Sequence, residues 1–136
     1  MIGLDTNVLI RYLLQDDEKQ SYLAVKTIEA AIHRGDCLYV CLIVLCEVVW
    51  VLDYHYELKK EDIVRFLDML LHSGSIEIEN REEVLGAFQE YQKASANFAD
   101  CLIGKTHQSR GCTTTYSFDK KALKLTTFTQ LGNDHR

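Results

Sequence analysis

The chain has 136 residues, of which 47% are hydrophobic, and it carries a formal net charge of -5 at pH 7. This length and composition suit one compact domain with a sizeable core, so we expect a single domain over residues 1–136. The negative balance argues against a protein that holds nucleic acid by bulk positive charge, although it permits a local basic rim.

Short apolar runs alternate with helical patterns along the chain. The run at 1–4 is followed by the polar triplet DTN, which indicates a buried strand that leads into a helix. In chain order, the patterns predict a strand at 1–4, helices at 8–14 and 17–34, a strand at 38–40, helices at 42–55 and 60–71, a strand at 75–79, helices at 81–94 and 97–108, a strand at 112–116, a helical turn at 119–125 and a last strand at 126–128. This alternation predicts an α/β sandwich around a mostly parallel central sheet.

Cysteine usage and hydropathy indicate a reducing, aqueous setting. The five cysteines are an odd number without a C-x-x-C pair, a pattern typical of reduced, buried thiols in a cytoplasm. The chain begins without the charged and apolar segments of a secretory signal, and the apolar run at 38–52 is shorter than the roughly 20 residues that span a bilayer. We therefore expect a cytoplasmic protein that does not enter a membrane.

Four carboxylates follow predicted strands or lie near predicted helix starts, and α/β folds gather their active sites at the carboxyl ends of the strands. Asp5 closes the first strand, and Asp119 follows the strand at 112–116. Glu47 and Asp100 lie near the starts of helices that could lean over the same edge. A divalent cation would offset the repulsion among these charges. Mg²⁺ and Mn²⁺ prefer oxygen ligands and can activate water for phosphodiester hydrolysis.

Glu47 is the only carboxylate in the apolar run LYVCLIVLCEVVWVL, whose helical part we expect to be buried on most sides. An isolated ionised group in such a setting costs several kcal/mol unless it is paired, neutralised or bound to metal. Its helical neighbours three and four residues away are all apolar, namely Ile43, Val44, Trp50 and Val51. The partner of Glu47 is therefore expected from the tertiary fold.

A purely structural interpretation of the same residues stays open. Asp5 and Asp119 could cap the helices that follow them, and Asn97 with Asp100 resembles a capping box. Glu47 could pair with a lysine or an arginine from elsewhere in the fold. Spacing alone therefore supports a metal site only weakly.

The order and local contexts of these residues resemble the PIN domain, specifically a VapC-type toxin ribonuclease. The stretches that carry the resemblance are MIGLDTNVLIRYLL, LCEVVWVL, NFADCLIG and TTTYSFDKKALK. They extend over essentially the whole chain. The resemblance implies a PIN-like α/β/α sandwich with a mostly parallel central sheet.

The resemblance also implies that four acidic positions bind one or two Mg²⁺ or Mn²⁺ ions and are catalytic in RNA hydrolysis. These positions are Asp5, Glu47, Asp100 and Asp119. Asp5 and Asp100 are then the foremost metal ligands. Glu47 would be a ligand or a base that orients the attacking water, and Asp119 would be a further ligand.

Polar residues beside the acidic positions match the family as well. Thr6 and Asn7 stand where the family has a polar pair after its first aspartate, and their side chains could orient Asp5. Ser117 keeps a hydroxyl at a position where the family often has threonine. Asn97 stands where many relatives have an additional aspartate.

The function implied is that of the toxin in a type II toxin-antitoxin pair. Metal-activated water would cleave structured RNA, such as a tRNA or ribosomal RNA loop, leaving 5'-phosphate and 3'-hydroxyl ends. A homodimer and a cognate VapB-like antitoxin are implied as well, and an acidic cleft would accept an arginine from that antitoxin.

Other functions compete with this one. A PIN nuclease with a housekeeping role in RNA processing would have no antitoxin. A non-catalytic PIN interaction module is disfavoured because all four acidic positions are kept. A HAD-like phosphatase needs a second aspartate two residues after the first, where this chain has Asn7.

Overall fold

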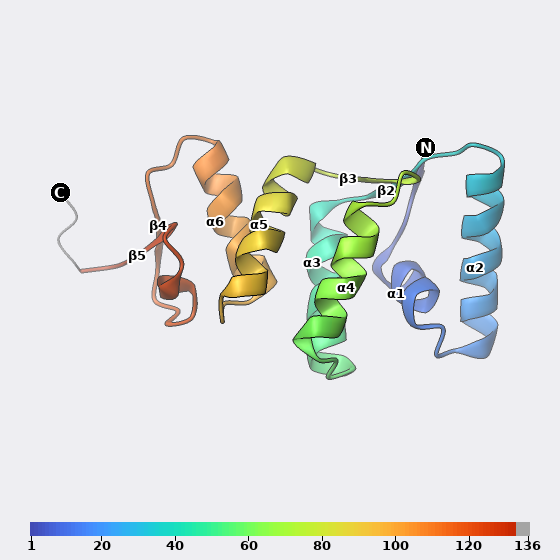
Figure 1. The fold of residues 1–136 in the computed structure, drawn as a ribbon, viewed down its shortest axis with the longest axis horizontal. Coiled ribbons are helices and arrows are strands. Elements are labelled where there is room, and N and C mark those ends of the chain that lie inside the picture. The colour runs from blue at the N-terminus through green and yellow to red at the C-terminus, as the bar shows by residue number, and fades with distance from the viewer. Residues whose placement is uncertain (133–136) are drawn as a thin grey trace. The chain divides into compact units, whose positions relative to one another are not determined.

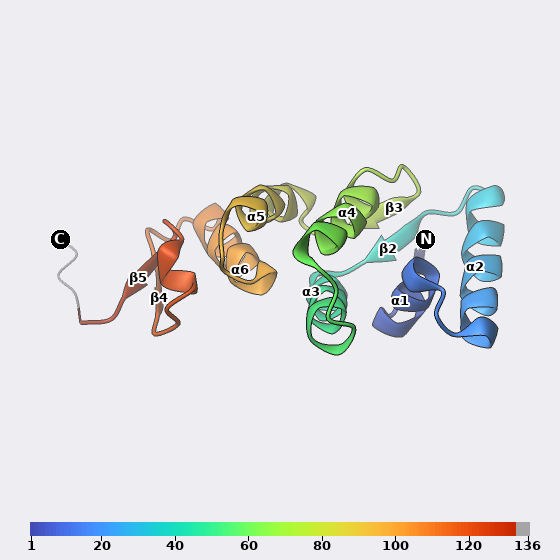
Figure 2. The same ribbon diagram turned by 60° about the horizontal axis from the view of Figure 1, so that its bottom comes forward.

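The computed structural model of the protein describes residues 1–132. The chain clusters into two compact units, a first over Met1–Glu79 and a second that begins at Asn80. Figures 1 and 2 show the ribbon from two directions. Among the described residues, no helix has both the length and the apolar character needed to cross a membrane.

The first unit alternates strands with helices. Its elements are β1 (Ile2–Gly3), α1 (Thr6–Leu14), α2 (Glu18–His33), β2 (Leu38–Val40), α3 (Leu42–Trp50), a π-helical turn (Val51–His55), α4 (Lys60–Leu71) and β3 (Ile76–Ile78). The three strands form a parallel sheet in the order β1-β2-β3, with Leu38 opposite both Ile2 and Ile76. Helix α1 contacts both α2 and α3, and α4 contacts β3.

Local sequence explains where the helices of this unit begin and end. Asp17 caps α2, because its side chain accepts a hydrogen bond of 2.8 Å from the backbone N–H of Gln20. The helix stops before Gly35, whose φ of 85° lies in the left-handed region that glycine adopts readily. Helix α4 buries Ile63 and Leu67 on one face, as its sequence periodicity predicts. The predicted bounds of β2 and α4 are confirmed.

The apolar run at 42–55 differs from expectation in two ways. It forms α3 and then the π-helical turn, where one continuous helix was predicted. The prediction that it is buried on most sides is also wrong. Val44 and Val48 are buried, but Ile43 and Trp50 are 74% and 60% exposed. Apolar composition indicates which residues favour burial, but it does not say which sides of a helix other elements cover.

The second unit pairs two helices with a small parallel sheet. Its elements are α5 (Arg81–Lys93), α6 (Phe98–Ser109), β4 (Thr115–Ser117), a 3₁₀ turn (Ala122–Lys124) and β5 (Phe128–Gln130). Helices α5 and α6 lie side by side (Figures 1 and 2). The rings of Tyr91 and Phe98 make an edge-to-face contact, with their centroids 5.7 Å apart. Strands β4 and β5 pair in parallel, with Thr115 opposite Phe128.

The predicted α/β class with parallel strands is confirmed, and the main differences lie in the last two strands. Strands β4 and β5 begin two or three residues later than the sequence predicts. The threonine run at 113–115 is β-prone throughout, so composition does not fix where pairing starts. Pairing starts where the backbone N–H of Thr115 donates to the carbonyl of Thr127, a long-range contact.

Candidate functional site

Thr6 links two of the predicted acidic residues within the first unit. Asp5 precedes α1 in an extended conformation, and its Oδ1 accepts a hydrogen bond of 2.8 Å from the backbone N–H of Thr6. The Thr6 hydroxyl donates to Glu47 Oε1 on α3, also at 2.8 Å. Thr6 itself is buried, with 8% of its surface exposed. Among residues 1–132, no other hydrogen bond to the Asp5 or Glu47 carboxylate is formed, so each keeps one oxygen available.

The position and the exposure of Glu47 differ from those predicted from the sequence. Glu47 lies in the middle of α3 rather than near its start, and it is exposed rather than enclosed by apolar side chains. No ion pair among residues 1–132 includes it, which removes the salt-bridge interpretation for the part of the chain described. The expected tertiary partner exists, but it is the hydroxyl of Thr6.

Asp100 and Asp119 interact electrostatically within the second unit. Asp100 lies in the first turn of α6 and is half-buried. Burial raises the pKa of the Asp100 carboxyl, and the negative charge of Asp119 raises it further. The two carboxylates therefore repel each other when both are ionised, a repulsion that a bound cation would relieve.

Asp119 is held in place by its own turn. Its Oδ1 accepts hydrogen bonds from the backbone N–H groups of Lys121 at 2.8 Å and Ala122 at 3.2 Å. Its backbone N–H donates to Ser117 Oγ at 2.9 Å. Asp119 thus stabilises the turn that follows it, although the N-cap residue of the 3₁₀ turn is Lys121, and Ser117 contributes a hydroxyl that fixes the turn. The capping interpretation is confirmed for Asp5, whose side chain caps α1.

The predicted capping box at the start of α6 does not form. Asn97 precedes the helix in an extended conformation, but its side chain makes no capping hydrogen bond. Spacing of the right kind permits a capping box but does not require one, because the side chain of Asn97 is exposed and water can satisfy the same groups.

The chemistry of both carboxylate pairs suits a hard divalent cation. Carboxylate oxygens are the ligands that Mg²⁺ and Mn²⁺ prefer, and one oxygen in each of Asp5 and Glu47 is available. Burial is the main cause of the raised pKa of Asp100, and the charge of Asp119, the second cause, is the one that a cation would offset. Within residues 1–132, no group of three or more His, Cys, Asp or Glu side chains is arranged to hold a metal ion. Each unit thus contains, within itself, a pair of suitable donors.

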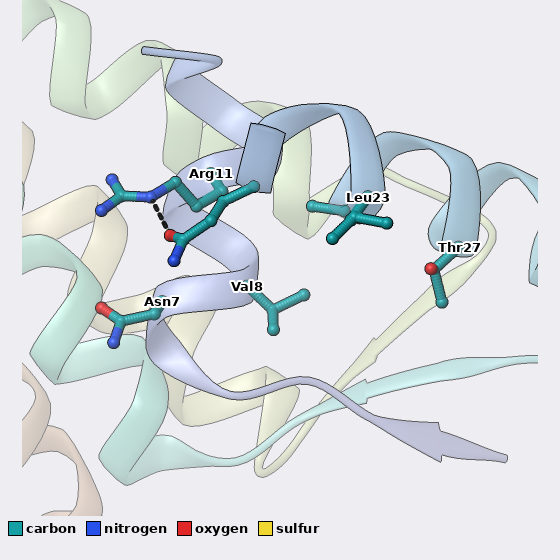
Figure 3. A pocket seen from close by; sticks show the side chains of 7 residues that line it. Asn7, Val8, Arg11, Leu23 and Thr27 are labelled. Carbon is teal, nitrogen blue, oxygen red and sulfur yellow. Dashed lines mark hydrogen bonds between the residues drawn. The ribbon is translucent and has the colours of Figure 1, made fainter. Parts of the chain in front are cut away.

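A hollow between α1 and α2 was not predicted from sequence. It has a volume of about 340 Å³, and Figure 3 shows Asn7, Val8 and Arg11 reaching it from α1, with Leu23 and Thr27 on α2. Asn7 forms no hydrogen bond with Asp5 among the described residues. The signal in the sequence is weak, because the exposed Val8 and Leu23 fit an ordinary helical pattern.

Arg11 is fixed at one end of this hollow by three partners. Its Nε donates to Gln20 Oε1 at 2.8 Å, and its Nη1 donates to Tyr56 Oη at 2.9 Å and lies 3.3 Å from Asp16 Oδ1. The hydrogen bond with Tyr56 raises the pKa of Arg11 further above its usual range. The network ties α1 to the start of α2 and to the end of the π-helical turn.

Glu79 is another acidic residue with a role that sequence patterns did not indicate. It follows β3, and its Oε1 accepts a hydrogen bond of 2.9 Å from the backbone N–H of Leu42 at the start of α3. Cys41, which precedes α3, makes no capping hydrogen bond with its own side chain. Glu79 therefore supplies the cap from a distant part of the chain, beyond the reach of local capping rules.

Comparisons with known proteins identify the family of the chain. Residues 2–127 match the PIN domain family. The chain is also 29% identical over 126 residues to a VapC ribonuclease of Aquifex aeolicus (strain VF5), an alignment that covers 90% of this chain and 90% of that protein. Because the family match extends over nearly all of both units, this chain belongs to the PIN domain family.

Proposed function

We propose that this protein is a VapC-type toxin nuclease, a hydrolase that cleaves phosphodiester bonds within RNA with the help of Mg²⁺ or Mn²⁺. The observation that carries the proposal is the match of residues 2–127 to the PIN domain family, supported by the similarity to a VapC ribonuclease. The two carboxylate pairs support it chemically, since oxygen donors of this kind suit a divalent cation.

The proposed metal ligands are Asp5 and Glu47 from the first unit and Asp100 and Asp119 from the second. A bound divalent cation supplies activation of water and stabilisation of charge on the phosphodiester oxygens. In the first unit, Thr6 would keep both carboxylates oriented through its backbone N–H and its hydroxyl.

The residues of the second unit have complementary roles in this proposal. The amides of Lys121 and Ala122 hold one oxygen of Asp119, and Ser117 holds its backbone. The raised pKa of Asp100 makes it take up a proton more readily than an ordinary aspartate when no cation is near. As pH rises, Asp100 would lose this proton, and its carboxylate could then bind a cation in its place.

The biological setting is part of the proposal. The substrate would be structured RNA, such as a tRNA or ribosomal RNA loop, and the active protein would be a homodimer. A VapB-like antitoxin would inhibit it by placing an arginine against the acidic residues. The five cysteines form no disulfide within residues 1–132, which suits a reducing compartment, so we place this activity in the cytoplasm.

Brief induction of the protein in a bacterial host, followed by sequencing of RNA ends, tests this function. We expect growth to stop and 5'-phosphate ends to accumulate at one or a few sites in structured RNA. Co-expression of the neighbouring small gene should restore growth if that gene encodes the antitoxin. Growth arrest without new RNA ends would contradict the nuclease function. New RNA ends that the neighbouring gene does not suppress would favour a housekeeping nuclease.

A further inference from the structure

Phe118 is an exposed aromatic residue directly beside a proposed metal ligand. Its side chain is 79% exposed, the highest value among the large hydrophobic residues in the described part of the chain. It lies between β4 and the 3₁₀ turn, immediately before Asp119. Tyr116, two residues earlier, is 58% exposed as well. Phe118 and Tyr116 therefore place two exposed aromatic rings within three positions of the chain, where a ligand can contact them.

The turn that carries Phe118 is fixed on both sides. Ser117 and Asp119 are joined by the 2.9 Å hydrogen bond from the Asp119 backbone N–H to Ser117 Oγ. The carboxylate of Asp119 in turn accepts a hydrogen bond from the backbone N–H of Ala122, which is fully buried in the 3₁₀ turn. The backbone around Phe118 is therefore held before any ligand arrives, which lowers the entropy lost on binding.

The same turn is locally basic in an acidic protein. Lys120, Lys121 and Lys124 are all exposed, and no ion pair within residues 1–132 includes them. The stretch YSFDKKALK contains these three lysines and only one acidic residue, whereas the whole chain has a net charge of -5. A polyanion is the ligand class whose charge complements this turn.

We propose that residues 116–124 bind an unpaired stretch of RNA, with a base stacked on Phe118 and flanking phosphates held by Lys120 and Lys121. An aromatic surface beside lysines is the combination that binds single strands, because every base has a stacking face while duplex bases are already stacked. This inference rests on the proposed function for its choice of RNA, and it adds that the strand next to Asp119 is unpaired.

A fluorescence titration without metal tests the proposal. The probe is an unstructured ten-nucleotide RNA with one 2-aminopurine, whose emission falls when the base stacks, and EDTA prevents metal-dependent cleavage. Wild-type protein should quench the probe, and Phe118→Ala should lose the quenching and bind about tenfold more weakly. Phe118→Trp should retain both. Phe118→Leu should behave like Phe118→Ala, because it keeps apolar bulk without an aromatic face.

The lysines have their own readout in the same titration. Combining Lys120→Gln with Lys121→Gln should reduce the slope of log affinity against log salt by about 1.4, the value for two lost single-strand phosphate contacts. Tyr54→Ala is the matched control, since Tyr54 is an aromatic residue of the π-helical turn with 62% exposure, and its ring stacks on Trp50. Its affinity and quenching should equal those of wild type.

Two results would overturn the proposal. One is a Phe118→Ala protein, folded by circular dichroism, that binds and quenches like wild type. The other is wild-type protein that binds the same sequence as a duplex with equal affinity. Because the titration contains no metal, binding as expected without any RNA cleavage in Mg²⁺ would leave this inference standing and defeat the proposed nuclease function.

Discussion

Thr6 shows how one buried residue can position two charges. Its backbone N–H and its hydroxyl bind Asp5 and Glu47, which are 42 positions apart in the chain and belong to different elements. Through the family resemblance, the sequence implied that the Thr6 side chain orients Asp5, whereas only the backbone N–H of Thr6 binds Asp5. It gave no sign of the link to Glu47, because a hydrogen bond between α1 and α3 depends on how the two helices pack.

Replacing Thr6 by valine should weaken metal binding by about 10- to 100-fold, because the shape is kept while the hydroxyl that orients Glu47 is lost. The free energy of unfolding should fall by about 1 kcal/mol for the lost hydrogen bond. Titration calorimetry with Mn²⁺ and urea denaturation measure the two effects. Thr6→Ser keeps the hydroxyl and should bind metal like wild type. An unchanged affinity in Thr6→Val would show that Thr6 has only a packing role.

Asp100 should make stability depend on pH in a defined direction. Burial, and then the charge of Asp119, raise its pKa in the folded protein above that of the unfolded chain. Below the unfolded pKa of about 3.9, the carboxyl is protonated in both the folded and the unfolded state, so its ionisation costs the folded protein no stability. The loss of stability develops as pH rises from the pKa of the unfolded chain to the higher pKa of the folded protein. Above the folded pKa it is complete.

Replacing Asp100 by asparagine should therefore increase the free energy of unfolding at pH 7, and this gain should vanish at about pH 3. Urea denaturation of metal-free protein at both pH values measures it. Asp68→Asn, which changes an exposed carboxylate on α4, should show a smaller difference between the two pH values. A loss of stability at pH 7 in Asp100→Asn would mean that the ionised carboxylate stabilises the fold.

At the scale of whole elements, α6 packs closely against the start of β5 and the residue that precedes it. Gly104 lies on α6 opposite Thr127, and a Cβ at Gly104 would clash with the Thr127 side chain and press on the ring of Phe128. Thr127 is only 6% exposed, so it has little freedom to move aside. The glycine is therefore needed for helix and strand to approach closely.

Gly104→Ala should destabilise the protein by about 1–2 kcal/mol in urea denaturation. Alanine gains up to about 1 kcal/mol of helix propensity, but overpacking costs about 1–3 kcal/mol. Gly74→Ala is the matched control, because a Cβ there meets open space. A Gly104→Ala protein as stable as wild type would show that β5 can shift without loss.

The elements also show where sequence patterns carry information. The bounds of β2 and α4 were predicted correctly, because strong periodicity and nearby breakers define them locally. The start of β4 and the cap that Glu79 provides to α3 were not, because both depend on residues distant in the chain. Long-range hydrogen bonds determine the start of β4 and the cap of α3, which local propensity does not define.

For the whole molecule, the sequence indicated the acidic residues but not all of their surroundings. The pairing of Glu47 with Thr6 replaces the buried, isolated charge that composition suggested. The electrostatic link between Asp100 and Asp119 agrees with the expectation that like charges raise a carboxyl pKa. The hollow between α1 and α2 and the exposed Phe118 emerged only from the structure, because exposure is a property of packing.

RNA cleavage by the purified protein tests the central claim most directly. Total cellular RNA is incubated with wild type, Asp100→Asn and Asp68→Asn in Mg²⁺ or in EDTA, and the new 5' ends are quantified by sequencing. We expect cleavage in Mg²⁺ that EDTA abolishes, a loss of roughly 100-fold or more in Asp100→Asn, and wild-type activity in Asp68→Asn. Cleavage that persists in EDTA, or that Asp100→Asn retains in full, would contradict a metal-dependent nuclease that uses these carboxylates.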